Sequence, residues 1–174
     1  MKKIILALLL LLIIGGGALY TIKGKDTYDA GKYNATLSNG LNEGSIISFT
    51  LPDQFDKSHT LSDAVSTLIF VSAKATGHTV KEFLKNQPKE YLEKHHALFI
   101  ADISPMPVII RNTFAMPDLK KQHYSVLLIY DKAFAGDFKK GTQEDKITIV
   151  SLKNGKIEKV DAVDSAEALE SSLE

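Results

Sequence analysis

The chain has 174 residues, no cysteine and no tryptophan, and its 21 basic side chains are balanced by 21 acidic ones. The lack of cysteine excludes disulfide bonds, thiolate catalysis and cysteine-ligated metals. Without an excess of positive charge, no basic face for phosphate contacts is expected, and nucleic acid is excluded as a partner.

The chain opens with an apolar segment. Lys2 and Lys3 precede a run from Ile4 to Ile22 that carries no charged side chain. This layout is typical of a secretory signal peptide, and the length is close to the roughly 20 residues that a transmembrane helix needs. Cleavage after Ala18 would make it a signal peptide, whereas without cleavage residues 1–22 would be a single anchor in the inner membrane with a cytoplasmic N-terminus. Both alternatives place the rest in the periplasm or on the extracytoplasmic face of the cytoplasmic membrane.

Residues 23–44 are predicted to form a flexible linker. The stretch contains four glycines and three asparagines among scattered apolar residues. It therefore lacks the buried surface that would offset the entropy lost on ordering. Such a linker would let the following domain, residues 45–174, stand clear of the membrane.

The first part of this domain is predicted to alternate strands and helices. Apolar residues at every second position of 47–51 fit a half-buried strand before a turn and a returning strand. Apolar runs at 67–71, 97–102 and 125–130 are typical of strands buried on both faces. One intervening helix is expected to start at Thr79, with Glu82 in capping-box spacing, and another to end near Pro117.

The last part is predicted to be a polar loop, a hairpin and a helix. Residues 131–145 have the composition of a loop, and Asn154-Gly155 fits a type I′ turn between two strands. Asp164 and Glu167 then have the spacing of a capping box. Strands and helices that alternate and close on a hairpin and a helix indicate an α/β sandwich around a mixed sheet.

This order of elements resembles the thioredoxin fold, in the form seen in peroxiredoxin-like and thiol-reductase-like periplasmic proteins. Phe49-Thr-Leu-Pro-Asp53 is similar to their N-terminal hairpin, and Asn154-Gly155 to the turn of their C-terminal hairpin. The chain also resembles the cysteine-poor YtfJ-type periplasmic proteins. The resemblance implies a thioredoxin-like sandwich with a mixed sheet and an N-terminal hairpin extension, preceded by an N-terminal hydrophobic helix. It implies no mechanism.

The position of the redox site carries hydroxyl groups instead of sulfur. In the redox families a Cys-x-x-Cys, or one peroxidatic cysteine, lies between the central strand and the next helix, whose N-terminus stabilises the thiolate. Here Thr76-Gly-His-Thr79 has that spacing, and no proline precedes the strand that begins near Ile147, where thioredoxins have a cis-proline. Thiol–disulfide oxidoreductase and peroxidase activities are therefore excluded.

Thr76, His78, Thr79 and Asp102 form the candidate corner for a ligand or partner. His78 beside a hydroxyl could be a base–nucleophile pair, and a helix N-terminus can bind an anion. The simpler interpretation makes Thr79 an ordinary N-cap and His78 an exposed neighbour. Asp102 ends a predicted strand at the edge where open α/β sheets place functional groups, and it equally suits the start of a turn.

No catalytic residue, metal or cofactor is expected. His95 and His96 are adjacent, so their side chains point apart on a helix or strand. His59 and His123 are distant from them and from each other in the sequence. The chain shows no clustered spacing of histidine and acidic residues of the kind that binds a metal.

Besides a relic of an antioxidant family that assists a cysteine-containing partner, two functions are compatible with these features. The first is a non-catalytic, membrane-tethered or periplasmic binding or scaffold domain that holds an envelope protein or peptide on the former active-site surface. The alternative is a small-ligand-binding protein, or an enzyme without thiol chemistry, that uses the corner of Thr76, His78 and Thr79. This alternative requires His78 to lie in a cleft beside a second polar group.

Overall fold

The computed structural model describes residues 24–174 together with residues 4, 5, 8, 16, 20 and 21. The predicted signal peptide or membrane anchor, with its hydrophobic helix, therefore lies largely outside the described residues. Among the residues that are described, no helix is long and apolar enough to cross a membrane.

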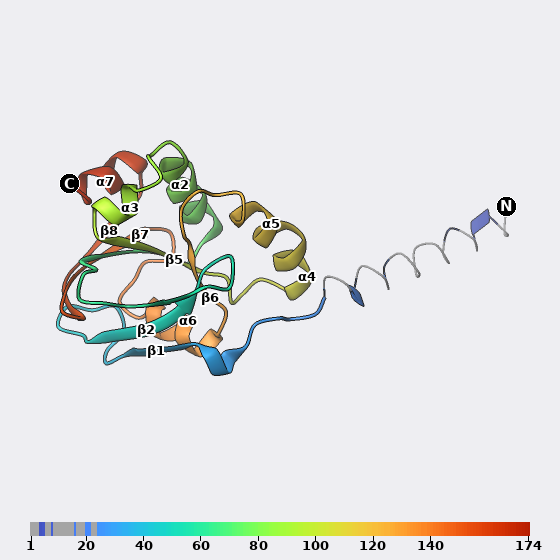
Figure 1. Cartoon of the computed structure of the whole chain (residues 1–174), viewed down its shortest axis with the longest axis horizontal. Helices are drawn as coiled ribbons and strands as arrows, with labels where there is room; N and C mark the ends of the chain where they lie inside the picture. Colours follow the sequence, from blue (N-terminus) through green and yellow to red (C-terminus); the bar gives the residue numbers. More distant parts are fainter. Residues whose placement is uncertain (1–3, 6–7, 9–15, 17–19, 22–23) are drawn as a thin grey trace.

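A five-stranded mixed sheet forms the centre of the domain (Figure 1). Its strands lie in the order β6 (Leu127–Ile129), β5 (Ala97–Asp102), β4 (Thr67–Val71), β7 (Ile147–Lys153) and β8 (Lys156–Val163). The first three are parallel, β7 is antiparallel to β4, and β8 is antiparallel to β7. The predicted mixed sheet and C-terminal hairpin are confirmed.

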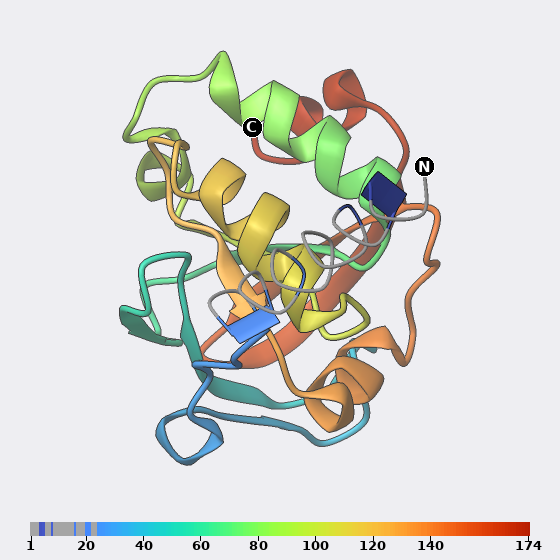
Figure 2. The ribbon, with the colours of Figure 1, turned by 90° about the vertical axis from the view of Figure 1, so that its right-hand side faces the viewer.

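Helices cover one face of this sheet (Figures 1 and 2). They are α2 (Lys74–Lys85), α3 (Tyr91–Lys94), α7 (Ala166–Ser171) and a continuous helix made of α4 (Val108–Ile110), the π-helical η2 (Arg111–Ala115) and α5 (Met116–Leu119). Ile69 and Val71 of β4 share a hydrophobic cluster with Val80 and Leu84 of α2. Burial of these apolar side chains stabilises the fold by about 2 kcal/mol each.

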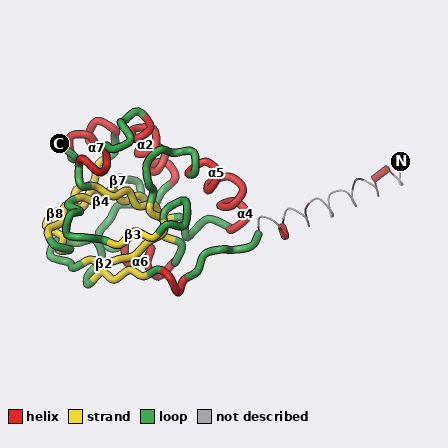
Figure 3. The backbone as a smooth tube through the Cα atoms, in the orientation of Figure 1, coloured by secondary structure: helices red, strands yellow, loops and turns green. Residues whose placement is uncertain are grey.

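A second layer covers the opposite face. It consists of α6 (Lys132–Lys139) and of an antiparallel sheet with β1 (Asn34–Leu37), β2 (Ile47–Pro52) and β3 (Ser58–Thr60) (Figure 3). Phe138 of α6 meets Phe70 of β4 and Phe49 of β2, with ring centroids 5.5 and 6.3 Å apart. Because alternate residues of β4 enter the two clusters, this strand is buried on both faces, as its unbroken apolar sequence predicts.

The flexible linker predicted for residues 23–44 is wrong for much of that stretch. Residues 30–32 form the 3₁₀ helix η1 (Ala30–Lys32), and β1 pairs with β2. The few apolar residues reach the core, since Tyr33 and Leu41 are 4% and 0% exposed. Gly40 has a positive φ, and a side chain there would collide with Lys140. The glycine therefore serves a tight turn rather than flexibility.

The start of α2 and the presence of α6 also differ from the prediction. α2 begins at Lys74, five residues before Thr79. Its N-cap is Ala73, which has extended backbone angles. The stretch 131–145, predicted to be a loop, contains α6. Asp131 caps this helix by accepting the Ala133 and Phe134 N–H groups at 2.6 and 3.2 Å.

The helix α4–η2–α5 continues past Pro117 to Leu119, instead of ending near Pro117. In its middle turn Met116 N–H donates to Arg111 O, five residues earlier. Proline has no N–H and so ends many helices, but this proline directly follows the π-helical turn, where the regular α-helical hydrogen-bond pattern is already interrupted. Pro117 is the second residue of α5, so the chain passes it without a break.

Candidate functional site

In the corner between β4 and α2, the hydroxyls of Thr76 and Thr79 are both bonded to backbone carbonyls. Thr76 is 5% exposed, and its Oγ1 donates to Ala73 O at 3.0 Å. Thr79 lies inside the helix, where its Oγ1 donates to Ala75 O at 3.3 Å. His78 is exposed, and within the described part of the chain no hydrogen bond joins it to either threonine. Both hydroxyl protons are thus directed at helix carbonyls and not at a base.

Asp102 takes part in the packing of the fold. Its Oδ1 accepts the Ser104 N–H at 2.9 Å, and Lys139 Nζ lies 2.8 Å from Oδ2. The carboxylate side chain is fully buried, so the lysine supplies the counter-charge that a buried carboxylate needs. Because Lys139 belongs to α6, Asp102 links β5 to the face opposite α2. No contact between described residues brings Asp102 to Thr76 or His78.

A cavity lies at the other end of the parallel strands, where β4 and β5 begin. It is an open groove of about 450 Å³. The lining includes the buried residues Leu92, Ala97 and Phe99 together with the exposed residues Glu93, His96 and His123. A surface of this size, with apolar side chains beneath convergent polar groups, is typical of a binding site.

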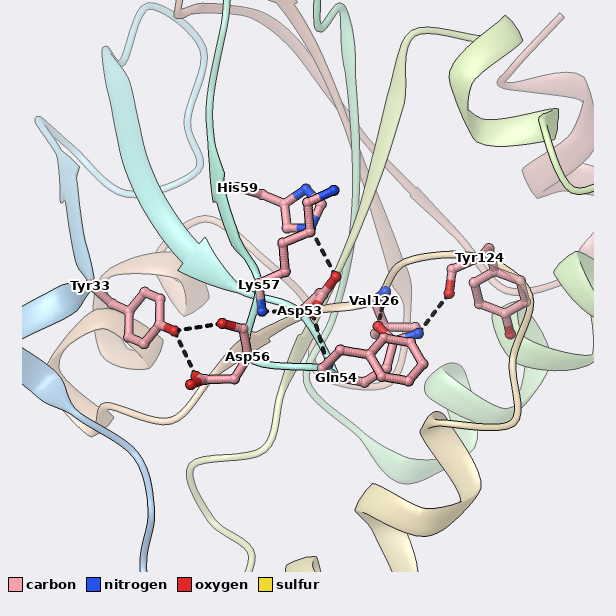
Figure 4. A network of polar contacts seen from close by, with 9 residues as sticks. Tyr33, Asp53, Gln54, Asp56, Lys57, His59, Tyr124 and Val126 are labelled. Atoms are coloured by element: carbon pink, nitrogen blue, oxygen red, sulfur yellow. Dashed lines mark hydrogen bonds and ion pairs between the residues drawn. The ribbon is translucent and has the colours of Figure 1, made fainter.

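Asp53 fixes the orientation of a further imidazole of the groove, that of His59 (Figure 4). Asp53 is 3% exposed, and its Oδ1 accepts the Phe55 and Lys57 N–H groups at 2.8 and 3.0 Å. Its Oδ2 lies 2.9 Å from His59 Nε2. The turn after β2 therefore orients the carboxylate, and the carboxylate in turn orients His59 at the groove.

Gln54 joins this turn to the edge strand β6 (Figure 4). It is fully buried, its Nε2 donates to Tyr124 O at 2.7 Å, and its Oε1 accepts the Val126 N–H at 2.8 Å. These bonds are those that a neighbouring strand would make, so one side chain satisfies the backbone just before β6 at the outer edge of the sheet. Sequence reasoning missed this role, and the only available signal was a glutamine directly after an apolar strand.

The imidazoles of the groove do not form a metal centre. In the parts of the chain that the structure describes, no group of three or more histidine, cysteine, aspartate or glutamate side chains could hold a metal ion. His59 is bound to Asp53, and His123 Nε2 lies 3.1 Å from Gln87 O. The groove therefore offers hydrogen-bonding groups and apolar surface to a ligand.

A second cluster surrounds Arg111 on η2. Arg111 is 4% exposed, its Nη2 lies 2.6 Å from Asp26 Oδ1, and its guanidinium carbon lies 4.6 Å from the Tyr130 ring centroid. The ring of Tyr28 stacks on the ring of Tyr130, with the ring centroids 4.6 Å apart. Arg111 Nε is buried and has no hydrogen-bond partner among the described residues. The cation is thus held by one carboxylate and one aromatic face.

The charges of this cluster shift nearby pKa values. Partial burial would raise the pKa of Asp26, but the Tyr28 N–H and the Arg111 guanidinium outweigh it and hold this pKa below its ordinary value. Burial raises the pKa of Tyr130 to about 12, although the charge of Arg111 opposes the rise. At neutral pH the cluster therefore contains a carboxylate, a guanidinium and a neutral phenol.

The chain is similar to solved structures of one fold. It aligns with a protein assigned as a thiol:disulfide interchange protein DsbE from Chlorobium tepidum, with a TM-score of 0.52 and 18% identity over 77% of this chain and 96% of that chain. It also aligns with a peroxiredoxin-like protein from Aquifex aeolicus, with a TM-score of 0.49 and 13% identity over 80% and 90% of the two chains. No protein-family model and no curated protein sequence matches it. The chain thus has the thioredoxin-like fold, with no cysteine anywhere in its sequence.

Proposed function

We propose that this chain is a non-catalytic, membrane-tethered binding domain outside the cytoplasm, which holds a partner protein or peptide in the groove beside His59. The fold is that of redox proteins, but thiol chemistry needs cysteine and the sequence has none. The hydroxyls of the former redox corner are bonded to helix carbonyls, and His78 is exposed. These contacts argue against catalysis at that corner.

The groove is the observation that carries the proposal. Its volume of about 450 Å³ suits one or two side chains of a partner. Phe99 and Leu92 supply an apolar surface, and the imidazoles of His59, His96 and His123 supply hydrogen-bonding groups. We therefore expect an extended segment with an apolar anchor residue flanked by polar groups. The proposed site lies where β4 and β5 begin. The corner of Thr76, His78 and Thr79, which the sequence indicates, lies at the other end of β4.

The proposed location depends on the sequence of the N-terminal segment. Lys2 and Lys3 followed by the uncharged run from Ile4 to Ile22 have the layout of an exported segment. We expect the mature protein to keep Met1 or its modified form as an uncleaved anchor. Intact-mass spectrometry of the protein purified from membranes tests this, since a chain that begins at Leu19 would contradict the tether.

Photo-crosslinking tests the groove directly. A photoreactive amino acid replaces Glu93 at the groove in the full chain, and in a matched variant it replaces Glu158, an exposed residue of β8. After illumination of cells of the source organism, the Glu93 variant should give a discrete adduct that the Glu158 variant lacks. Equal adduct patterns from both variants, or no adduct from Glu93 and from a second variant at His123, would rule the groove out.

A further inference from the structure

The folded domain begins directly after the apolar N-terminal run. Among the described residues, Gly24 N–H donates to Tyr20 O at 2.8 Å, a hydrogen bond of helical spacing. The next residue is already attached to the domain, because Lys25 O accepts from Asn112 Nδ2 at 3.0 Å. Asp26 follows with its 2.6 Å contact to Arg111. The stretch thought to be a spacer is therefore attached to η2 from its third residue.

This attachment limits how far the domain can stand from the apolar run. Three residue steps separate Ile22, the last residue of the run, from Lys25. A fully extended chain covers about 3.5 Å per residue, so the connection spans about 10 Å at most. If the run is anchored in a membrane, η2 and the helix around it must lie close to the surface of that membrane.

The outward side of the same helix is apolar. Ile110 is 46% exposed and Phe114 is 65% exposed, and they are four residues apart, so they lie on one side of the helix. Arg111 between them is buried against Tyr130. Figure 2 views the domain from this side and shows the helix, in yellow, on the face toward the viewer.

We propose that Ile110 and Phe114 rest in the headgroup region of the membrane that anchors the chain. This inference rests on the proposed tether. Apolar side chains on the outer side of an amphipathic helix enter the interface between headgroups and acyl chains. The exposed residues Lys120 and Lys121, which follow the same helix, suit anionic lipid headgroups at its rim. A bilayer is the occupant that the short connection places beside this surface.

Membrane contact at this helix also fixes where the groove lies relative to the membrane. β5 begins at Ala97, which lines the groove, and ends at Asp102, shortly before α4. A strand of this length spans about 20 Å. The groove and the start of the apolar helix, which carries Ile110, therefore lie at opposite ends of β5. A membrane at Ile110 leaves the groove accessible to a partner in the aqueous compartment.

Tryptophan fluorescence tests the contact without background, since the chain has no tryptophan. The full-length Phe114→Trp chain is reconstituted in vesicles of phosphatidylcholine and phosphatidylglycerol with brominated acyl chains. Its emission should shift to the blue and be quenched several-fold more strongly than that of an Ile46→Trp chain. Ile46 is 62% exposed and pairs with Lys156 of β8, and Figure 1 shows β8 and α4 on opposite sides of the domain. Ile110→Trp is a second reporter and should behave like Phe114→Trp.

The outcomes separate this inference from the tether itself. A chain that does not float with the vesicles would overturn the tether, whatever its fluorescence. A chain that floats while both reporters are quenched no more than Ile46→Trp would overturn the membrane contact alone. A blue shift without quenching by brominated lipid would also overturn it, since another protein or a second copy would then cover the two residues.

Discussion

Arg111 and Asp26 lie 85 residues apart in the sequence, and their side chains meet at 2.6 Å. Arg111 is almost completely buried, whereas the side chain of Asp26 is 46% exposed. A buried cation needs a counter-charge, and here it comes from the stretch that follows the apolar N-terminal run. Tyr28 adds a stacked ring on Tyr130 beside the ion pair. Residues 25–28 are therefore held on the domain by charge and by ring stacking together.

Replacing Asp26 should loosen this stretch while the domain stays folded. Asp26→Asn removes the negative charge that faces Arg111, and the exposed stretch then opens more often. Trypsin should cleave after Lys25 or Lys32 several-fold faster than in the parent chain. Asp63→Asn, at an exposed position, is the matched control and should leave the rate unchanged. Equal cleavage rates in all three chains would show that the ion pair does not hold the stretch.

Acid should have the same effect as this substitution. The folded-state pKa of Asp26 lies below its ordinary value because of the Tyr28 N–H and Arg111, which outweigh partial burial. The contribution of the contact is therefore complete above the ordinary aspartate pKa of about 4, and it is lost as the pH falls through the lowered value. The protection of residues 25–33 from hydrogen exchange, taken relative to the intrinsic exchange rate at each pH, should fall below about pH 4 in the parent chain. In Asp26→Asn, which is already loosened, it should not change.

Gln54 should contribute more to stability than its position in a turn suggests. Gln54→Met keeps the side-chain volume but leaves Tyr124 O and the Val126 N–H without their partners. Each unpaired buried group costs about 1–3 kcal/mol, so the free energy of unfolding should fall by about 3 kcal/mol. Urea denaturation measures this loss. Gln143→Ala, at an exposed position, should change the free energy of unfolding by less than about 0.5 kcal/mol.

The strands and turns that can be predicted from the sequence are those whose characteristic residues lie in one continuous segment. β4 and β5 are recognisable because both of their faces are buried, which leaves an apolar run, and Asn154-Gly155 marks the hairpin of β7 and β8. β1 is missed because its apolar residues, Ala35 and Leu37, alternate with polar ones over only four residues, and because pairing with β2 holds it in place. Strand pairing of this kind depends on a partner elsewhere in the chain and leaves only a weak local trace.

The candidate site was harder to predict for the same reason. The spacing of Thr76 and Thr79 is a local feature, and it points to the corner between β4 and α2, where the hydroxyls are bonded to backbone carbonyls. The groove instead gathers His59, His96 and His123 from three separate segments. Their proximity is a product of the whole topology, so no motif in the sequence contains it.

The true start of α2 can be tested by substitutions at two positions. Ala73, the N-cap residue, has extended backbone angles but no side-chain acceptor. Ala73→Asp should therefore raise the free energy of unfolding by about 1 kcal/mol. Thr79→Ala should change it by less than about 0.5 kcal/mol, since alanine favours the helix interior. Thermal and urea denaturation report both values. A loss of about 1 kcal/mol in Thr79→Ala would restore Thr79 as the helix cap.

High pH should unfold the domain through its tyrosines. Burial raises the pKa of Tyr33 to about 12, and the hydrogen bond to Asp56 adds to the rise. Burial likewise raises the pKa of Tyr130 to about 12. Because the folded state favours the neutral phenols, their contribution to stability is complete below the ordinary pKa of about 10 and is lost as the pH rises through 12. The urea midpoint should therefore fall steadily above about pH 10, in step with tyrosinate absorbance.

Tyr33→Phe separates this effect from general alkaline damage. The phenylalanine keeps the stacked ring against Tyr28 but removes one titrating group and its bond to Asp56. Its chain should be less stable than the parent at neutral pH, since the Asp56 bond is lost. It should also lose less further stability between about pH 10 and 12. The slope of the unfolding free energy against pH measures the difference in bound protons between the unfolded and folded states. If both chains lose stability with the same slope in that range, the titration of Tyr33 is not coupled to unfolding.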